Sequence, residues 1–492
     1  MISTEHFEAL FDPRAIVVAG ASTHPGKFGF VALHNILSCG YTGEVFATNR
    51  ERAEVLGRPT LADLTELPDG VVDLVFVCTP APSNPELLRQ AASKGIRAAF
   101  LASAGYGESG DEGRRLQDEL VELADGLDIL IVGPNGQGLV STPSQLCAQI
   151  VAPFPPAGRI GIASQSGNFV SSFMNLSRQS GVGVSRAISV GNAAQVGVID
   201  MLEYFADDPA TSVGLVYLEG VANGREFADR LEAVCRRLPV VVVKGGASGS
   251  GAKAAASHTG SLATDDRVFD GMLRQVGAVR ASSIAEAFDI AAAFATLPPP
   301  PGPRLAIVTT VGGWGVLAAD ATSSTSLELV DLPEDLRGTL DELLPPRWSR
   351  SNPIDLAGGE TKDTVPAVLD AVVGHPQIDA TLLLGMGIQS NQGRLEKEGP
   401  FFPDHGLERI VAFHDRQDSR YVDVALAAAA KMNRPVLIAS ELAIADPTNA
   451  AVAAVRQADG YCFPSAERAV TALDHMHRRE QWLRSLADES SD

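Results

Sequence analysis

The feature that most constrains the fold is a series of short apolar runs, each followed by a segment with helical periodicity. Buried parallel strands joined by amphipathic helices produce this alternation, because such strands are covered on both faces and carry few polar residues. The pattern therefore predicts an α/β fold with parallel sheets. The N-terminal runs are AIVVAG (15–20), GEVFATN (43–49), LVFVCTP (74–80), AAFLAS (98–103) and DILIVG (128–133).

Two proline-rich stretches divide the chain of 492 residues, APFPPAG (152–158) and TLPPPPGP (296–303). Consecutive prolines interrupt helices and strand ladders, so both stretches are expected to be linkers. Apolar runs recur after each linker, and domains typically hold roughly 100–200 residues. The sequence therefore predicts three α/β domains. They are a Rossmann-like domain over 1–140, a second domain over 157–297 and a third over 303–480.

Composition excludes several classes of protein. A formal charge of −21 would repel nucleic acid, and no apolar stretch reaches the roughly 18–20 residues that a membrane span needs. The N-terminal residues include acidic side chains where a signal peptide carries basic ones, so a cytoplasmic location is expected. The five cysteines lie far apart without CxxC spacing, which predicts neither a disulfide framework nor a metal site.

A glycine-rich turn, GASTHPGKFG (20–29), follows the first predicted strand and precedes a helix. Such a turn lets the backbone approach a phosphate, and the helix N-terminus favours negative charge. It lacks both GK[ST] and GxGxxG, so it predicts a nucleotide-like ligand only in general terms, and a purely structural turn stays the alternative. The later strand ends at 77–83 and 102–110 would line the same crevice. Arg50, just past the second strand, is a candidate contact of a ligand phosphate, although a single surface arginine is more often only solvated.

Two further segments carry possible chemistry. In IASQSGNF, residues Ser164, Gln165, Ser166 and Gly167 stand between a predicted strand and helix, where they could form a neutral cup for phosphate or could only cap the helix. The Gly-, Ala- and Ser-rich segment 245–263 contains one histidine, His258. A histidine on such a segment suits a phosphoryl carrier, although single histidines are more often structural. Glu219, at a strand end, could orient the imidazole or could only be a capping residue.

Taken in order along the chain, these motifs resemble the ADP-forming (NDP-forming) acyl-CoA synthetases, which are related to the α subunit of succinyl-CoA synthetase. The resemblance spans roughly residues 10–475 and implies that the second and third domains are flavodoxin-like domains of the succinyl-CoA synthetase type. The motifs that carry it are GASTHPGKFG, VCTPAP, ASAGYGE, GPNGQGL, IASQSGNF, ISVGNAAQVGVIDMLEYFADDP, LEG, AAASHTGS, VTTVGGWGVLAADA, NPIDL and YCFPSAERAVTAL.

The resemblance implies a relay in which phosphate attacks acyl-CoA, a histidine takes the phosphoryl group from acyl phosphate, and ADP then receives it. It identifies His258 as the phosphohistidine, Glu219 as its orienting carboxylate and the Ser164–Gly167 segment as the phosphate cup. Gly191 and Asn192 would lie in a loop facing the acyl site. The expected contacts of coenzyme A are Ser22, Pro25, Gly26, Gly29, Arg50, Thr79, Pro80, Ala104, Gly105 and Glu108.

The chain departs from the family pattern at two points. Nothing in the sequence corresponds to the ATP-grasp module that binds the nucleotide in this family, so an ATP-grasp β subunit is expected as the partner in a hetero-oligomer. That partner would bind ADP or ATP with Mg²⁺. Trp314 stands where the family usually has a small residue or proline.

Two rival functions remain open on the sequence alone. A protein that senses acyl-CoA or acts as a scaffold could keep the fold without the relay, although it would not need His258 and Glu219. An NAD-dependent enzyme would carry GxGxxG and an acidic residue after the second strand, where this chain has ATNR.

Overall fold

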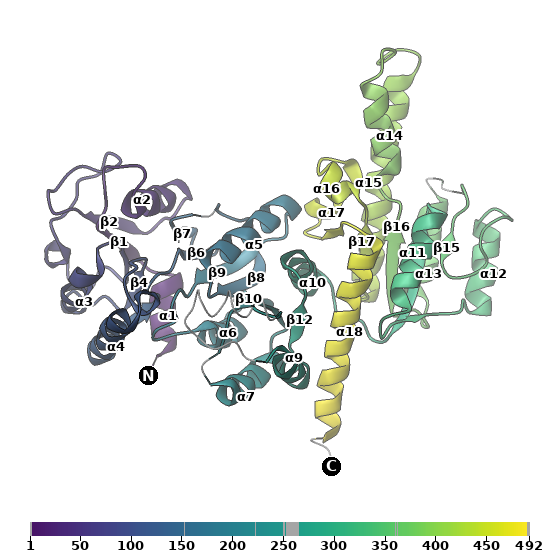
Figure 1. Cartoon of the computed structure of the whole chain (residues 1–492). Helices are drawn as coiled ribbons and strands as arrows, with labels where there is room; N and C mark the ends of the chain where they lie inside the picture. The colour runs from purple at the N-terminus through teal and green to yellow at the C-terminus, as the bar shows by residue number, and fades with distance from the viewer. Residues whose placement is uncertain are drawn as a thin grey trace. The chain divides into compact units, whose positions relative to one another are not determined.

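The computed structural model describes residues 2–151, 153–221, 223–248, 251, 265–359, 361 and 363–489. They form two compact units, Met1–Arg178 with Gly183–Ala287, and Gln179–Val182 with Phe288–Asp492. The first unit contains two β-sheets and the second contains one (Figure 1). Within the described ranges, no helix is both long and apolar enough to cross a membrane.

The first sheet is parallel, with the strand order β2-β1-β3-β4-β5. This is a doubly wound order: β2 is added on one side of β1, and β3, β4 and β5 are added on the other side. Such a change of side leaves a crevice between β1 and β3 at their carboxyl ends. Every residue of β1, β3, β4 and β5 is buried. The elements are α1 (Thr4–Phe11), β1 (Ala15–Ala19), α2 (Phe28–Ser38), β2 (Glu44–Thr48), β3 (Leu74–Val77), α3 (Asn84–Ser93), β4 (Ala98–Leu101), α4 (Asp111–Gly126) and β5 (Leu130–Val132).

The second sheet has the order β12-β11-β10-β8-β9-β6-β7. Its strands from β8 onward repeat the doubly wound order, whereas β6 and β7 form an antiparallel hairpin that adds to β9. The hairpin therefore belongs to the second sheet although it follows the first in the chain. The elements are β6 (Gly138–Ser141), β7 (Leu146–Gln149), β8 (Ala157–Ser164), α5 (Gly167–Ser180), β9 (Val184–Ser189), α6 (Val198–Asp207), β10 (Val213–Leu218), α7 (Gly224–Cys235), β11 (Val240–Lys244), α9 (Asp266–Gln275) and β12 (Val279–Ala281).

The sheet of the second unit has the order β14-β13-β16-β17-β18, and β15 also pairs with β13. Helices α14 and α15 form a hairpin that extends away from this sheet (Figure 1). The elements are α10 (Ile284–Thr296), which spans the unit boundary, β13 (Arg304–Thr309), α11 (Gly312–Thr322), β14 (Glu328–Leu329), α12 (Glu334–Leu343), β15 (Ile354–Asp355), α13 (Thr364–Gly374), β16 (Ala380–Leu384), α14 (Ile388–Lys397), α15 (Leu407–Met432), β17 (Val436–Ala439), α16 (Leu442–Ala445), α17 (Ala450–Gln457), β18 (Cys462–Phe463) and α18 (Ala466–Glu489).

Local sequence signals account for several helix starts. The Asp200 carboxylate accepts a hydrogen bond from the Gly197 N–H at 2.6 Å and so caps α6. The Asn223 side chain caps α7 by accepting from the Glu226 N–H at 3.3 Å. Capping groups satisfy N–H groups that have no partner within the helix.

An ion pair ties the start of β13 to the start of β16 in the second unit. The buried Asp379 carboxylate accepts from Arg304 Nε and Nη2, both at 2.8 Å. Burial alone would raise the pKa of Asp379, but the hydrogen bonds and charge of Arg304 lower it overall. The ionised pair therefore stabilises the folded unit.

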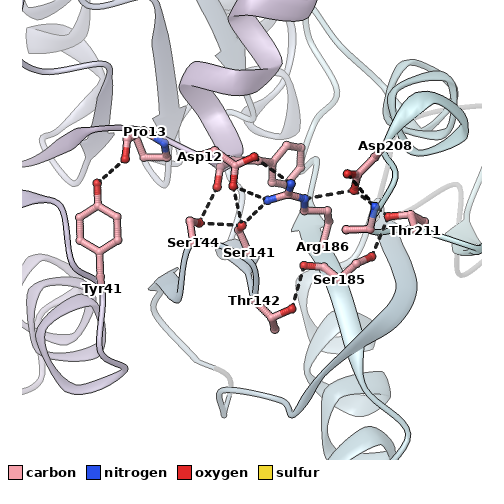
Figure 2. A network of polar contacts seen from close by, with 12 residues as sticks. Asp12, Pro13, Tyr41, Ser141, Thr142, Ser144, Ser185, Arg186, Asp208 and Thr211 are labelled. Atoms are coloured by element: carbon pink, nitrogen blue, oxygen red, sulfur yellow. Dashed lines mark hydrogen bonds and ion pairs between the residues drawn. The ribbon is translucent and has the colours of Figure 1, made fainter.

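A buried arginine joins α1 to the second sheet (Figure 2). Arg186 on β9 donates to both carboxylate oxygens of Asp12, at 2.7 and 2.8 Å, and to Asp208 at 3.2 Å. It also hydrogen-bonds Ser141 on β6 and lies 5.6 Å from the centre of the Phe11 ring. Burial would lower its pKa, but these carboxylates raise it overall.

The structure confirms the predicted α/β fold, and each apolar run of the sequence contains a strand. The predicted domain boundaries, 1–140, 157–297 and 303–480, stay predictions. The β6–β7 hairpin was not predicted, because its strands are four residues long and β6 pairs with β9, a strand far along the chain, for example Leu139 with Ile188.

Candidate functional site

The glycine-rich turn joins β1 to α2 at the predicted crevice. Gly20 has a φ of +85°, and a β-carbon at Gly29 would lie 2.1 Å from the Gly20 carbonyl oxygen, so both positions require glycine. Between them, the Ser22 hydroxyl accepts from the His24 N–H at 3.1 Å, and His24 Nδ1 accepts from the Gly26 N–H at 3.0 Å. The exposed turn residues, Pro25 among them, are therefore held in a defined loop.

The end of β2 lies beside this turn. The Ala21 N–H donates to the Thr48 carbonyl at 2.9 Å, and the Asn49 side chain donates to the Ala21 carbonyl at 2.9 Å. Arg50 follows directly and is exposed. That Arg50 contacts a ligand phosphate stays a prediction.

A buried asparagine connects the loops that follow β3 and β4. Asn84 donates to Ser103 Oγ at 3.2 Å and to Tyr106 Oη at 2.9 Å, and it accepts from Thr79 Oγ1 at 2.9 Å. Ser103 in turn donates to the Thr79 carbonyl at 2.6 Å. Asn84, Ser103 and Tyr106 were not singled out from the sequence, although an asparagine before a proline at a helix start is a recognisable signal. The predicted ligand-contact residues Pro80 and Ala104 are exposed in these two loops.

Glu108 lies next to Asn192, so a predicted coenzyme A contact meets the predicted acyl-site loop. Asn192 Nδ2 donates to Glu108 Oε2 at 2.6 Å and to Gln117 Oε1 at 2.9 Å. Glu108 Oε1 also accepts from the N–H groups of Gly105 and Tyr106, at 2.5 and 3.1 Å. Partial burial would raise the pKa of Glu108, but the hydrogen bonds, that of Asn192 first among them, lower it overall. The carboxylate therefore fixes both loops.

The backbone of the same loop requires a glycine at the neighbouring position, Gly191. It has a φ of +54°, and a β-carbon there would lie 2.2 Å from the Pro134 carbonyl oxygen. The Asn192 N–H donates to that carbonyl at 2.9 Å. The loop is thus packed against the GPN segment of the chain.

The Ser164–Gly167 segment forms the start of α5 at the carboxyl end of β8. Ser164 is buried, and its hydroxyl accepts from the Ser166 N–H at 3.1 Å and donates to the Ser166 carbonyl at 2.6 Å. At Gly167 a β-carbon would lie 2.2 Å from the Gln137 side chain. The Ser164 hydroxyl therefore stabilises the turn through the Ser166 backbone. Ser166 and Gly167 stand at the helix N-terminus, where an anion would be favoured.

Gln165 connects this segment to the end of β10. Its side-chain oxygen accepts from the Glu219 N–H at 2.5 Å, and its amide donates to the Gly220 carbonyl at 3.0 Å. The structure thus brings the predicted phosphate cup and the predicted orienting carboxylate, Glu219, to one edge of the second sheet. The sequence assigned the cup and Glu219 to the same site, but it did not predict the hydrogen bonds that join them.

Tyr217, which was not predicted, contacts the Glu219 side chain. Burial raises the pKa of Tyr217 to about 12, and the charge of Glu219 and a hydrogen bond to it act in the same direction. The phenol therefore stays protonated and donates to the carboxylate. Its ring stacks on Phe169 of α5 with the centroids 3.8 Å apart.

His258 lies outside the described residues. The strand that precedes its segment ends at Lys244, which is buried. The Lys244 ammonium lies 3.7 Å from Asp266 and 5.4 Å from the centre of the Phe269 ring. Trp314, at the start of α11 in the second unit, is half-buried. In the described part of the chain, no three His, Cys, Asp or Glu residues are grouped to hold a metal ion.

The fold defines a doubly wound α/β protein with successive sheets and glycine-rich or polar loops at the carboxyl ends of their strands. Three family models match it in order: a CoA binding domain over 14–142, a succinyl-CoA ligase like flavodoxin domain over 157–294 and a Ligase-CoA domain over 305–388.

Proteins of similar sequence define the family within this class of CoA-binding, ligase-like proteins. The α subunit of acetate–CoA ligase (ADP-forming) I from Pyrococcus furiosus is 38% identical over 382 residues, which make up 77% of this chain and 82% of that protein. Acetate–CoA ligase (ADP-forming) I from Archaeoglobus fulgidus is 37% identical over 377 residues, which make up 77% of this chain and 54% of that protein. The chain belongs to the family of ADP-forming acyl-CoA ligases, which confirms the resemblance found in its motifs.

A solved structure agrees with this membership. It is that of Ca. Korarchaeum cryptofilum dinucleotide forming acetyl-coenzyme A synthetase 1 in complex with phosphate and ADP. It matches with a TM-score of 0.84 and 28% identity, and the match covers 99% of both chains.

Proposed function

We propose that the chain is the coenzyme A-binding, phosphohistidine-bearing subunit of an ADP-forming acyl-CoA synthetase. It interconverts acyl-CoA, ADP and phosphate with a carboxylic acid, coenzyme A and ATP. The observation that carries the proposal is the pair of hydrogen bonds between the Gln165 side chain and the backbone of Glu219 and Gly220, just after β10. They hold the phosphate cup beside Glu219, the carboxylate that a nucleophilic imidazole needs.

Coenzyme A is bound at the crevice of the first sheet. The turn from Ser22 to Gly29 offers backbone N–H groups and a helix N-terminus to its phosphates, and Arg50 adds positive charge beside them. Thr79, Pro80, Ala104 and Gly105 line the opposite wall. The Glu108–Asn192 contact brings this wall against the loop that faces the acyl group.

The chemistry proceeds in two transfers within this chain. A phosphate oxygen attacks the thioester carbon, the C–S bond breaks, and coenzyme A leaves as a thiol after taking a proton. An imidazole nitrogen of His258 then attacks phosphorus, and the carboxylic acid leaves as its carboxylate. The N-terminus of α5 stabilises the negative charge that the phosphoryl group carries throughout.

Glu219 supports the second transfer. Its carboxylate accepts the other imidazole N–H and stabilises the ring as it becomes positively charged. The Tyr217 hydroxyl donates to the same carboxylate and so limits its rotation. Gln165 positions the backbone on which Glu219 stands.

The phosphoryl group then passes to a nucleotide on a partner chain. The partner is an ATP-grasp β subunit that binds ADP with Mg²⁺, and the assembly is a cytoplasmic hetero-oligomer. Two observations support a partner: relatives named as α subunits, and the Archaeoglobus fulgidus relative, of which the matched part is only 54%. Mg²⁺ offsets phosphate charge during such transfers.

Phosphorylation of the isolated chain tests the proposal. The full chain is incubated with acetyl phosphate, and its intact mass is measured before and after mild acid. We expect one acid-labile phosphoryl group in the wild type and none in His258→Ala. His34→Ala serves as a matched control, because His34 is exposed on α2, away from the second-sheet site, and should be phosphorylated normally.

Coenzyme A binding is measured in parallel by thermal shift. Binding that persists in His258→Ala would show that the variant is folded, so a loss of phosphorylation would then belong to the histidine. Phosphorylation retained in His258→Ala would refute the relay. Coenzyme A binding with no phosphorylation from several acyl phosphates, in the presence of a competent partner, would favour a sensor of acyl-CoA.

A further inference from the structure

Two cysteines face each other where the first sheet's helix α2 covers an edge of the second sheet. Cys39 follows the last residue of α2, and Cys147 lies in β7, the terminal strand of the seven-stranded sheet. The two side chains are close enough for each thiol to shift the pKa of the other. The pair therefore spans the contact between the two sheets of the first unit.

The register of α2 on β7 explains this meeting. The Asn35 side chain donates to the Gln149 carbonyl at 2.7 Å, which fixes one point of contact. Cys39 is four residues further along the helix, about 6 Å at 1.5 Å per residue. Cys147 is two residues back along the strand, about 7 Å at 3.3 Å per residue. The two steps match, so Cys39 lies over Cys147.

A second contact confirms the register. A β-carbon at Gly40 would lie 3.0 Å from the side-chain oxygen of Gln145, the residue just before β7. The contacts thus run in order along both elements, with the cysteines between the other two pairs. The closeness of the sulfurs follows from the packing of α2 and not from one side-chain rotamer alone.

The two thiols differ in accessibility and acidity. Cys39 is half-buried, and the Cys147 thiol lowers its pKa, although burial opposes the shift. Cys147 is buried, and its pKa is raised by the Cys39 thiol and by burial. A thiolate attacks disulfides and a thiol does not, so Cys39 is suited to react first and Cys147 to react second.

We propose that Cys39 and Cys147 form a redox-active pair that low-molecular-weight disulfides oxidise to a disulfide, which fastens α2 to β7. The Cys39 thiolate attacks one sulfur of the oxidant, whose S–S bond breaks, and one small thiolate leaves. Cys147, having lost its proton to water, then attacks Cys39 and displaces the second small thiol. The protein loses two protons and two electrons, and the small disulfide takes them up to become two thiols.

The other cysteines lack this arrangement and serve as internal controls. Burial raises the pKa of Cys78 to about 12, and it raises the pKa of Cys462 to about 12 as well. Cys235 is buried on α7. The thiolate fractions of Cys78 and Cys462 at neutral pH are small, so these two should react slowly with the same oxidant.

The test uses the reduced full chain and oxidised glutathione, followed by peptide mapping without reductant. We expect a linked pair of peptides containing Cys39 and Cys147, a rise in the thermal unfolding temperature, and reversal of both by dithiothreitol. Cys147→Ala should instead accumulate glutathione on Cys39, because the second step is blocked. Cys39→Ser should form neither product, and Cys78→Ala should behave as the wild type.

The variants also separate folding defects from chemistry. Cys39→Ser and Cys147→Ala should melt within a few degrees of the reduced wild type, and Cys39 should be alkylated about tenfold faster or more than Cys235 and Cys462 in the native wild type. Linkage between other cysteines, or glutathione that stays on Cys39 in the wild type, would overturn the pair. Failure of the wild type to react with oxidised glutathione while denatured protein reacts would overturn it as well.

Discussion

Replacing Arg186 by methionine removes the cation that three elements of the first unit share. Asp12 is partly exposed and can be hydrated, but the Asp208 carboxylate is buried and would keep only the Thr211 hydroxyl at 2.8 Å and the Ala210 N–H at 3.2 Å. Leaving one charge of a buried pair without its partner costs about 3–5 kcal/mol. For a unit of this size, that predicts a fall in the unfolding temperature of roughly 5–8 °C.

Scanning calorimetry of the full chain measures this loss, and two further variants show its origin. Arg230→Met is the matched control, because Arg230 pairs with partly exposed carboxylates and should change stability by about 1 kcal/mol or less. Adding Asp208→Asn to Arg186→Met should recover about half of the loss, since no buried charge is then left unpaired. Equal effects of Arg186→Met and Arg230→Met would refute the reasoning.

Other predictions concern the loop contact, the carboxylate and acid stability. Glu108→Gln and Asn192→Asp should each lower the free energy of unfolding by about 1–3 kcal/mol. The double variant should regain the lost stability in thermal melts, because an amide at 108 can donate to a carboxylate at 192. Tyr217→Phe loses a hydrogen bond worth about 1.5 kcal/mol to Glu219, so the rate of phosphohistidine formation should fall about tenfold; an unchanged rate would exclude Tyr217 from the site. The lowered folded pKa of Asp379 means that its stabilisation is complete above about pH 4 and is lost as the pH falls through the folded pKa. Melting temperatures of Asp379→Asn should therefore depend less on acid than those of the wild type, and parallel curves would contradict this.

The sheets could be predicted because each central strand is encoded locally. AIVVA and VVVV are buried on both faces, and the helices between strands carry their own periodicity and caps. Pairing across long sequence distances leaves no such local signal. The pairing of the β6–β7 hairpin with β9 was therefore not anticipated. The α14–α15 hairpin, whose second helix runs from Leu407 to Met432, was not singled out either.

The site could be predicted in part for a related reason. Glycines and polar residues directly after strands are visible in the sequence, which located the turn at Gly20–Gly29 and the segment at Ser164–Gly167. Contacts between loops are not visible there. The Gln165–Glu219 and Glu108–Asn192 hydrogen bonds, and the role of Tyr217, depend on how neighbouring strands align.

The placement of β6 and β7 has a consequence for how such a chain can be divided. A fragment that begins after Gln149 would leave β9 as a bare edge open to association with other chains, and one that ends there would carry a hairpin with no strand to pair with. A division within 138–149, or directly after it, therefore separates the hairpin from the strand that it extends. A division that keeps the second sheet whole has to fall before Gly138.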